Sequence, residues 1–175
     1  MAWVWGSGMS SVYLLDTNIF VEAYKRYYAF DIAPSFWTAL KSKAELGYVR
    51  SIDRVYDEIN SYGEDDQLKI WVNNEFETEW FISTDNEVIL EAYSDIINWV
   101  FGQAQFKEAA KAEFATVADG WLLACAKANS QIIVTHESFN RDVRKRVPIP
   151  VVCEQFNIPY INTFDMLRRL NVRLG

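Results

Sequence analysis

The sequence predicts an α/β fold in which helices surround a parallel β-sheet. Residues 12–15 form a short, continuously apolar run, and residues 131–135 form a second strand with an apolar centre. Such runs are typical of strands that are buried on both faces of a sheet. Segments with helical apolar periodicity lie between and after these runs, and this alternation favours parallel strands joined by helices.

The composition excludes several classes of protein. Half of the 175 residues are apolar, which excludes a disordered chain, and the length fits a single domain. Cys125 and Cys153 are too few for a disulfide framework, and we expect both in the core. The single histidine, His136, excludes zinc sites that need two. No apolar run approaches the ~20 residues of a membrane span.

The first eight residues are expected to be an added leader. Gly6-Ser7-Gly8 directly before Met9 is typical of a cloning junction, and we expect Met9 to be the natural start. The stretch lacks the basic region and long apolar core of a signal peptide. We therefore expect one domain over residues 9–175 in a cytoplasmic protein.

The elements of the first half follow from apolar periodicity and from residues that favour helix ends. Pro34 suits a first turn and Gly47 a C-cap, which predicts a helix over 31–47 and then a strand at 48–50. Ser51 or Asp53 is expected to cap the next helix, on which Glu58 lies at the rim of the apolar face. The acidic run 64–66 favours the start of another helix.

The second half continues the same alternation. Helices are expected at 87–101, 106–114, 119–128, 151–156 and 164–170, a strand at 160–162, and an ambiguous segment at 81–82. One of residues 83–85 is expected to cap the helix at 87–101, and Thr163 the last helix.

Three acids that are distant in sequence are expected to converge. Asp16 ends the first strand, at the sheet edge where ligands bind in open α/β folds. The helix opened by Asp119 and the strand that follows it each cover ~16 Å in opposite directions, so Glu137 should emerge near Asp119. A right-handed crossover would bring Asp16 to the same edge. A simple role as the cap of its own helix would explain the position of Asp119 about as well as a role in a site.

Converging carboxylates need protons or cations. Two carboxylates about 4 Å apart repel by roughly 4 kcal/mol at an effective dielectric constant near 20. Oxygen ligands without histidine suit Mg²⁺ or Mn²⁺, and ions held in this way can activate water against a phosphodiester. This pattern predicts a metal-dependent phosphodiesterase.

Two basic clusters are candidates for contact with a nucleic acid. Lys25 and Arg26 lie in an aromatic run, 24–30, that could stack bases, the alternative being that its rings belong to the core or to a subunit interface. The second cluster follows Glu137, and a solvated face is its alternative; its members are Arg141, Arg144, Lys145 and Arg146. The net charge of −7 argues against a generic polyanion binder, but a local basic patch can suffice.

At these residues the sequence resembles the PIN-domain proteins, the fold of VapC-type toxin ribonucleases. The motifs that carry the resemblance are Leu14-Leu15-Asp16-Thr17-Asn18, Glu58, Asp119 before Trp121-Leu122-Leu123-Ala124, and Ile133-Val134-Thr135-His136-Glu137. Segments 27–32, 152–153 and 160–162 are similar to a less-characterised bacterial and archaeal branch.

The resemblance implies a three-layer α/β/α sandwich with a central, mostly parallel five-stranded sheet. It implies endoribonuclease activity with Mg²⁺ or Mn²⁺, and a homodimer that a partner antitoxin inhibits. The acidic cluster of catalytic residues and metal ligands would be Asp16, Glu58, Asp119 and Glu137, with Asn18 and Thr135 as positioning residues.

Two alternatives stay open at this point. A haloacid-dehalogenase-like phosphatase also places a nucleophilic Asp at the end of its first strand, but it needs a second acid where this chain has Asn18. A catalytically inactive PIN-like RNA-binding scaffold is the other alternative. It is left open by the overall acidity and by Glu137, which stands where many PIN proteins have Asp.

Overall fold

A five-stranded, all-parallel sheet forms the centre of the protein, whose computed structural model describes residues 10–175. The strands run in the order β3-β2-β1-β4-β5. Their bounds are β1 (Tyr13–Leu15), β2 (Val49–Ile52), β3 (Phe81–Ile82), β4 (Ile132–Val134) and β5 (Tyr160–Ile161). The predicted α/β class is confirmed, and the ambiguous segment 81–82 is an edge strand. The expected leader, residues 1–8, lies outside the described residues.

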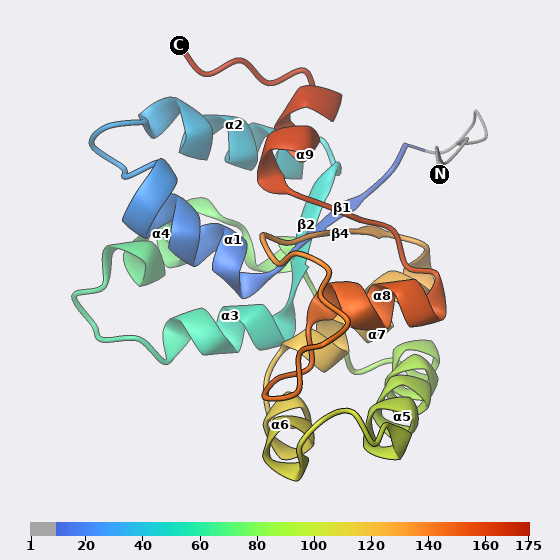
Figure 1. Cartoon of the computed structure of the whole chain (residues 1–175). Coiled ribbons are helices and arrows are strands. Elements are labelled where there is room, and N and C mark those ends of the chain that lie inside the picture. Colours follow the sequence, from blue (N-terminus) through green and yellow to red (C-terminus); the bar gives the residue numbers. More distant parts are fainter. Residues whose placement is uncertain (1–9) are drawn as a thin grey trace.

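Helices cover both faces of this sheet and make three layers (Figure 1). Figure 1 shows α1, α2 and α4 on one side and α5, α7 and α8 on the other. The helices are α1 (Thr17–Glu22), a π-helix η1 (Ala23–Tyr27), α2 (Pro34–Glu45), α3 (Asp53–Asn60), α4 (Gln67–Glu75), the 3₁₀ turn η2 (Thr78–Trp80), α5 (Glu87–Gly102), α6 (Glu108–Phe114), α7 (Asp119–Asn129), α8 (Ile149–Phe156) and α9 (Thr163–Arg169). Within residues 10–175, none is both long and apolar enough to cross a membrane.

The two central strands are buried on both faces, as their apolar runs predict. Leu14 and Leu15 of β1 and Ile133 and Val134 of β4 have no exposed surface. The strands pair in parallel with Leu15 opposite Val134. The next residue of each strand therefore emerges at the same edge of the sheet.

Two helix caps fall one position away from the predicted residues. α5 is capped by Asn86 rather than by one of residues 83–85, and α9 by Asn162 rather than by Thr163. In both helices the asparagine side chain accepts hydrogen bonds from first-turn amides. Asn, Asp, Ser and Thr offer similar capping chemistry, so the local pattern does not select among neighbours.

The prediction for the start of α3 is met in part: the N-cap position is Ile52, without a capping side chain, but Asp53 at the first helical position accepts from the Arg54 amide over 2.8 Å, whereas Ser51 has another role. Ser51 lies in β2, and its hydroxyl donates to the carbonyl of Leu15 over 2.8 Å. Asp53 accepts from the amide and hydroxyl of Thr84 over 2.9 and 2.8 Å. Asp53 therefore ties the start of α3 to the segment after β3.

Replacing Asp53 by Ala is expected to lower the free energy of unfolding by about 2–3 kcal/mol. The change removes the acceptor of two donors on Thr84, which is only 1 % exposed, and a buried donor without a partner is costly. Urea unfolding would measure the loss. Asp57→Ala is the matched control, because Asp57 is an exposed acid on the same helix. Equal effects of the two substitutions would contradict the prediction.

Candidate functional site

Asp16 and Thr135 meet at the carboxyl edge of the sheet. Each follows the last residue of a central strand, and those last residues are paired in register. The Thr135 hydroxyl lies 3.4 Å from Asp16 Oδ2, a long hydrogen bond, and accepts from the Glu137 amide over 3.2 Å. Thr135 therefore links the Asp16 carboxylate to the backbone of Glu137.

A cleft of about 220 Å³ opens at this edge and is lined by carboxylates from separate parts of the chain. Glu58 comes from α3, Asp119 from the first turn of α7, and Glu137 from the loop after β4. Asp16 is only 2 % exposed, yet these acids are close enough to raise the pKa of its carboxyl group. Glu113 of α6 also lines the cleft.

Burial and mutual repulsion make the two inner acids weak. Burial is the main cause that raises the pKa of Asp16 well above its usual range, and the charges of Asp119 and Glu137 raise it further. A hydrogen bond from the Asn18 backbone opposes this shift. The pKa of Asp119 is raised to about 7, first by burial and then by the charges of Glu137 and Glu58. The cleft therefore favours binding of protons or cations.

Glu137 has partners at both carboxylate oxygens. Oε1 lies 2.7 Å from Nη1 of Arg146, and Oε2 accepts from the amide of Ile149 over 2.9 Å. Ile149 opens α8, where a negative charge is favourable. Glu137 therefore has a structural role, at the start of α8, in addition to its place beside Asp119.

Glu58 is oriented by Thr17, which was not among the predicted site residues. The hydroxyl of Thr17 donates to Glu58 Oε2 over 3.0 Å and joins α1 to α3. Thr17 stands between two motif residues, Asp16 and Asn18, so its position was a usable signal. Glu113 had no such signal, because α6 reads only as an Ala- and Lys-rich helix.

The donor set of the cleft fits Mg²⁺ or Mn²⁺. Within residues 10–175, no three side chains of His, Cys, Asp or Glu stand close enough together to hold an ion as a cage. Mg²⁺ does not need such a cage, because it commonly keeps several waters and binds through one or two carboxylates and substrate phosphates. Asp16 and Asp119 are the two acids whose pKa the charges of both Glu58 and Glu137 raise.

The structure separates the predicted basic residues into two groups. Arg146 lines the acidic cleft, and Arg26 lines an adjoining hollow of about 410 Å³ that also includes Tyr27 and His136. The guanidinium of Arg26 pairs with Glu22 over 3.1 Å. The second group is exposed and lines neither hollow; its members are Lys25, Arg141, Arg144 and Lys145.

The aromatic run 24–30 belongs partly to the core. Tyr28 stacks on Phe36 with ring centroids 4.3 Å apart, and Phe30 lies against Trp37 at the same separation. Tyr27 is 49 % exposed and lies 5.6 Å from the His136 ring. In this run, therefore, Tyr27 is the one exposed ring that could stack on a base.

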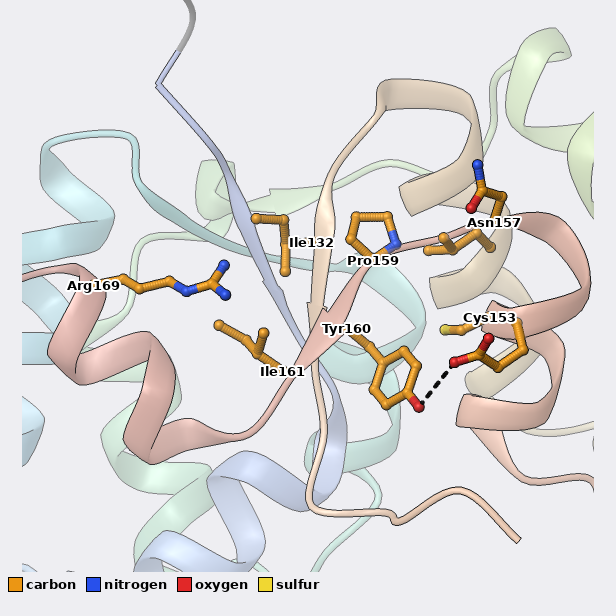
Figure 2. Close-up of a pocket in the computed structure, with 9 residues that line it drawn as sticks. Ile132, Cys153, Asn157, Pro159, Tyr160, Ile161 and Arg169 are labelled. Carbon is orange, nitrogen blue, oxygen red and sulfur yellow. Dashed lines mark hydrogen bonds between the residues drawn. The ribbon is translucent and has the colours of Figure 1, made fainter. Parts of the chain in front are cut away.

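Another hollow, of about 280 Å³, lies beside β5 and α8 (Figure 2) and shares no lining residue with the acidic cleft. Its lining includes Cys153, Tyr160 and Arg169, and the Tyr160 hydroxyl donates to Glu154 over 3.3 Å. Burial raises the pKa of the Cys153 thiol, which makes it a poor nucleophile. This hollow is lined by one carboxylate, that of Glu154, and by none of the four predicted acids.

The fold and the cleft define an α/β protein with an acidic site at the carboxyl edge of a parallel sheet. The chain belongs to the family described as "Domain of unknown function (DUF4411)", whose model matches residues 13–174. A search of curated proteins finds no match. A solved structure with similarity is that of VapBC2 from Rickettsia felis bound to a DNA fragment from their promoter. It has a TM-score of 0.49 and 14 % sequence identity, and the match covers 86 % of this chain and 98 % of that chain.

Proposed function

We propose that the protein is a Mg²⁺- or Mn²⁺-dependent endoribonuclease of the PIN type. The observation that carries the proposal is that Glu58, Asp119 and Glu137 line one cleft at the sheet edge where Asp16 lies buried, together with the raised pKa of Asp16 and Asp119. Carboxylates that share one cleft are stabilised by a divalent cation, and oxygen donors select Mg²⁺ or Mn²⁺.

In this proposal Asp16 and Asp119 hold the cation and the other residues set their geometry and charge. Thr135 holds the Asp16 carboxylate. The exposed side chain of Asn18 lines the cleft and is available to position substrate or water. A bound cation would supply an activated water and neutralise developing charge on a phosphodiester.

The two glutamates have different supporting roles. Glu58, oriented by Thr17, faces the cleft as a further ligand or water-binding group. Glu137 contributes its charge beside Asp119 while Arg146 and the Ile149 amide hold its oxygens. A water between Glu137 and the cation would suit this arrangement better than direct ligation.

The finer parts of the proposal rest on the resemblance to VapC-type toxins. They are an RNA substrate, a role as the toxin of a toxin–antitoxin pair, a homodimer and a cytoplasmic location. An adjacent gene that encodes a small DNA-binding protein would support the toxin role, and co-purification of the two products would test it.

The phosphatase alternative is weakened by the burial of Asp16. A nucleophile must reach phosphorus, but Asp16 is 2 % exposed and is not among the residues that line the cleft. The inactive-scaffold alternative has one observation in its favour, which is the Glu137–Arg146 ion pair in the cleft.

A cleavage assay separates these activities. We expect the protein to cut a mixed pool of single-stranded RNAs when Mn²⁺ is added and to leave the pool intact in EDTA. RNA binding without cleavage at any metal concentration would favour the scaffold. Release of phosphate from a monoester, with the RNA pool intact, would favour the phosphatase.

A further inference from the structure

A hollow of about 400 Å³ continues the acidic cleft on its α3–α7 side. It shares Glu58 and Val117 with the cleft, so the two spaces are contiguous. Arg54 of α3 and Trp121 of α7 line its walls. The proposed catalytic function uses neither residue.

Arg54 is held in one orientation by contacts on two sides. Its Nε donates to the hydroxyl of Thr84 over 3.2 Å, and its Cζ lies 4.7 Å from the centroid of the Trp121 ring. Trp121 in turn stacks on Tyr93 with centroids 3.8 Å apart and planes 6° from parallel. Thr84 is fixed by Asp53. The guanidinium is therefore pre-organised, which lowers the entropic cost of binding a ligand.

Within the described part of the chain, the two terminal nitrogens of the Arg54 guanidinium have no hydrogen-bond partner. Within residues 10–175, Arg54 has no carboxylate within 4.0 Å, and its terminal nitrogens make no hydrogen bond to protein. Arg146 and Arg26, which line the neighbouring spaces, are each engaged by a glutamate. A fixed, planar fork of donors that faces a hollow suits a phosphate group.

The spacing of Arg54 from the acids fits a second phosphate of the same strand. Arg54 and Glu58 are four residues apart on α3, on one face of the helix and ~6 Å apart along its axis. This rise is comparable to the separation of successive phosphates in an extended nucleic-acid strand. The first turns of α7 contribute Asp119 to the cleft and Trp121 to the Arg54 hollow, and α3 contributes Glu58 to both spaces.

We infer that Arg54 binds the phosphate next to the scissile one, in the hollow beside the acidic cleft. This inference rests on the proposed nuclease function. The Trp121 ring already stacks on Tyr93 and carries the Arg54 guanidinium, so Trp121 supports the arginine rather than a base. Arg54 is thus a substrate-binding residue that selects a continuous polyanionic strand over a single phosphodiester.

A neutral methylphosphonate linkage provides the test. RNA oligonucleotides with one cleavage site would carry this linkage one position to either side of the scissile bond. For the wild-type protein, we expect the linkage on one side to lower kcat/KM about 10-fold. Arg54→Ala should cause a loss of similar size with the normal RNA, and the neutral linkage should then cost nothing more. If the neutral linkage lowers kcat/KM of Arg54→Ala by the same factor as it lowers that of the wild type, the two effects are independent and the inference is overturned.

Binding measurements in EDTA judge the inference separately from catalysis. With a single-stranded RNA, Arg54→Ala should weaken binding and reduce the slope of log affinity against log salt by about 0.7–1. Arg54→Lys should keep the slope, because it keeps the charge. Arg169→Ala is the matched control, since Arg169 is an exposed arginine at the remote hollow of Figure 2.

The outcomes separate the two proposals. RNA cleavage that is unaffected by Arg54→Ala, with unchanged salt dependence, would reject the phosphate site and leave the nuclease intact. A wild-type protein that binds RNA through Arg54 but never cuts it would reject the nuclease and retain the site. Equal thermal stability of the variants would show that these effects come from the ligand contact, and a loss of binding that merely follows a loss of folded protein would count against the site.

Discussion

At pH 8, Asp119→Asn is expected to abolish metal-dependent RNA cleavage and to raise the free energy of unfolding by up to about 4 kcal/mol. The pKa of Asp119 is about 7 in the folded protein against a usual value of 3.8. A shift of about three pKa units corresponds to ~4 kcal/mol of unfavourable charge above pH 7. The amide removes that charge, and with it a ligand of the proposed cation. Activity and stability should therefore change in opposite directions.

The sign of the pH dependence follows from the raised pKa of Asp119. Between about pH 4 and pH 7 the folded state holds a proton that the unfolded state has released. The wild-type protein should therefore lose stability as the pH rises through this window, and the advantage of Asp119→Asn should grow over the same window. Below about pH 4 both states are protonated, and the advantage should vanish. Urea unfolding at a series of pH values would measure it.

This experiment also decides between a charged site and a simple helix cap. A capping role predicts that Asp119→Asn is nearly neutral and that Asp119→Ala costs about 0.5–2 kcal/mol. In the structure the Asp119 side chain makes no capping bond, and the N-cap position of α7 is Ala118. Asp65→Asn, on an exposed loop, is the control for the change in net charge. A loss of stability with cleavage intact would refute the proposed site.

The parts of the site that could be predicted depend on backbone topology. The apolar runs at 12–15 and 131–135 identify the two central strands, and pairing of those strands brings Asp16 beside Thr135. Asp119 begins α7 and Glu137 follows β4, so the chain leaves this sheet edge along the helix and returns to it along the strand, although β4 spans only Ile132–Val134, and both acids line one cleft. Glu58 could not be predicted from topology. Its sequence context alone indicated a solvated helix residue, and only the family resemblance placed it in the acidic cluster.

The parts that could not be predicted depend on side chains that meet across the fold. The Thr17–Glu58 hydrogen bond and the Arg146–Glu137 ion pair join residues from different elements. Arg54 reads in sequence as an ordinary surface residue, and its fixed orientation depends on residues 30 and 67 positions away, Thr84 and Trp121. Local periodicity contains no information about such contacts.

The second large effect concerns the cation itself: Mn²⁺ is expected to stabilise the folded protein and to bind more tightly as the pH rises. At a concentration 100 times its Kd, an ion that binds only the folded state adds about 2.7 kcal/mol. For a chain of this length, that corresponds to a rise in Tm of about 5–10 °C. Thermal unfolding with Mn²⁺ and with EDTA would measure the difference.

Proton release distinguishes this site from adventitious binding to surface acids. The raised pKa of Asp16 and the pKa of about 7 of Asp119 mean that the ion must displace protons near neutrality. The logarithm of the affinity should therefore rise with pH below about pH 7, the pKa of Asp119, by about 1 per pH unit for each acid that loses a proton on binding. Calorimetry in buffers of different ionisation enthalpy would count the protons released.

Exposed carboxylates are already ionised at pH 6, so binding there would release none, and a pH-independent affinity would place the ion outside the cleft. Asp119→Asn should release about one proton fewer and bind the ion more weakly, whereas Asp65→Asn should behave as wild type.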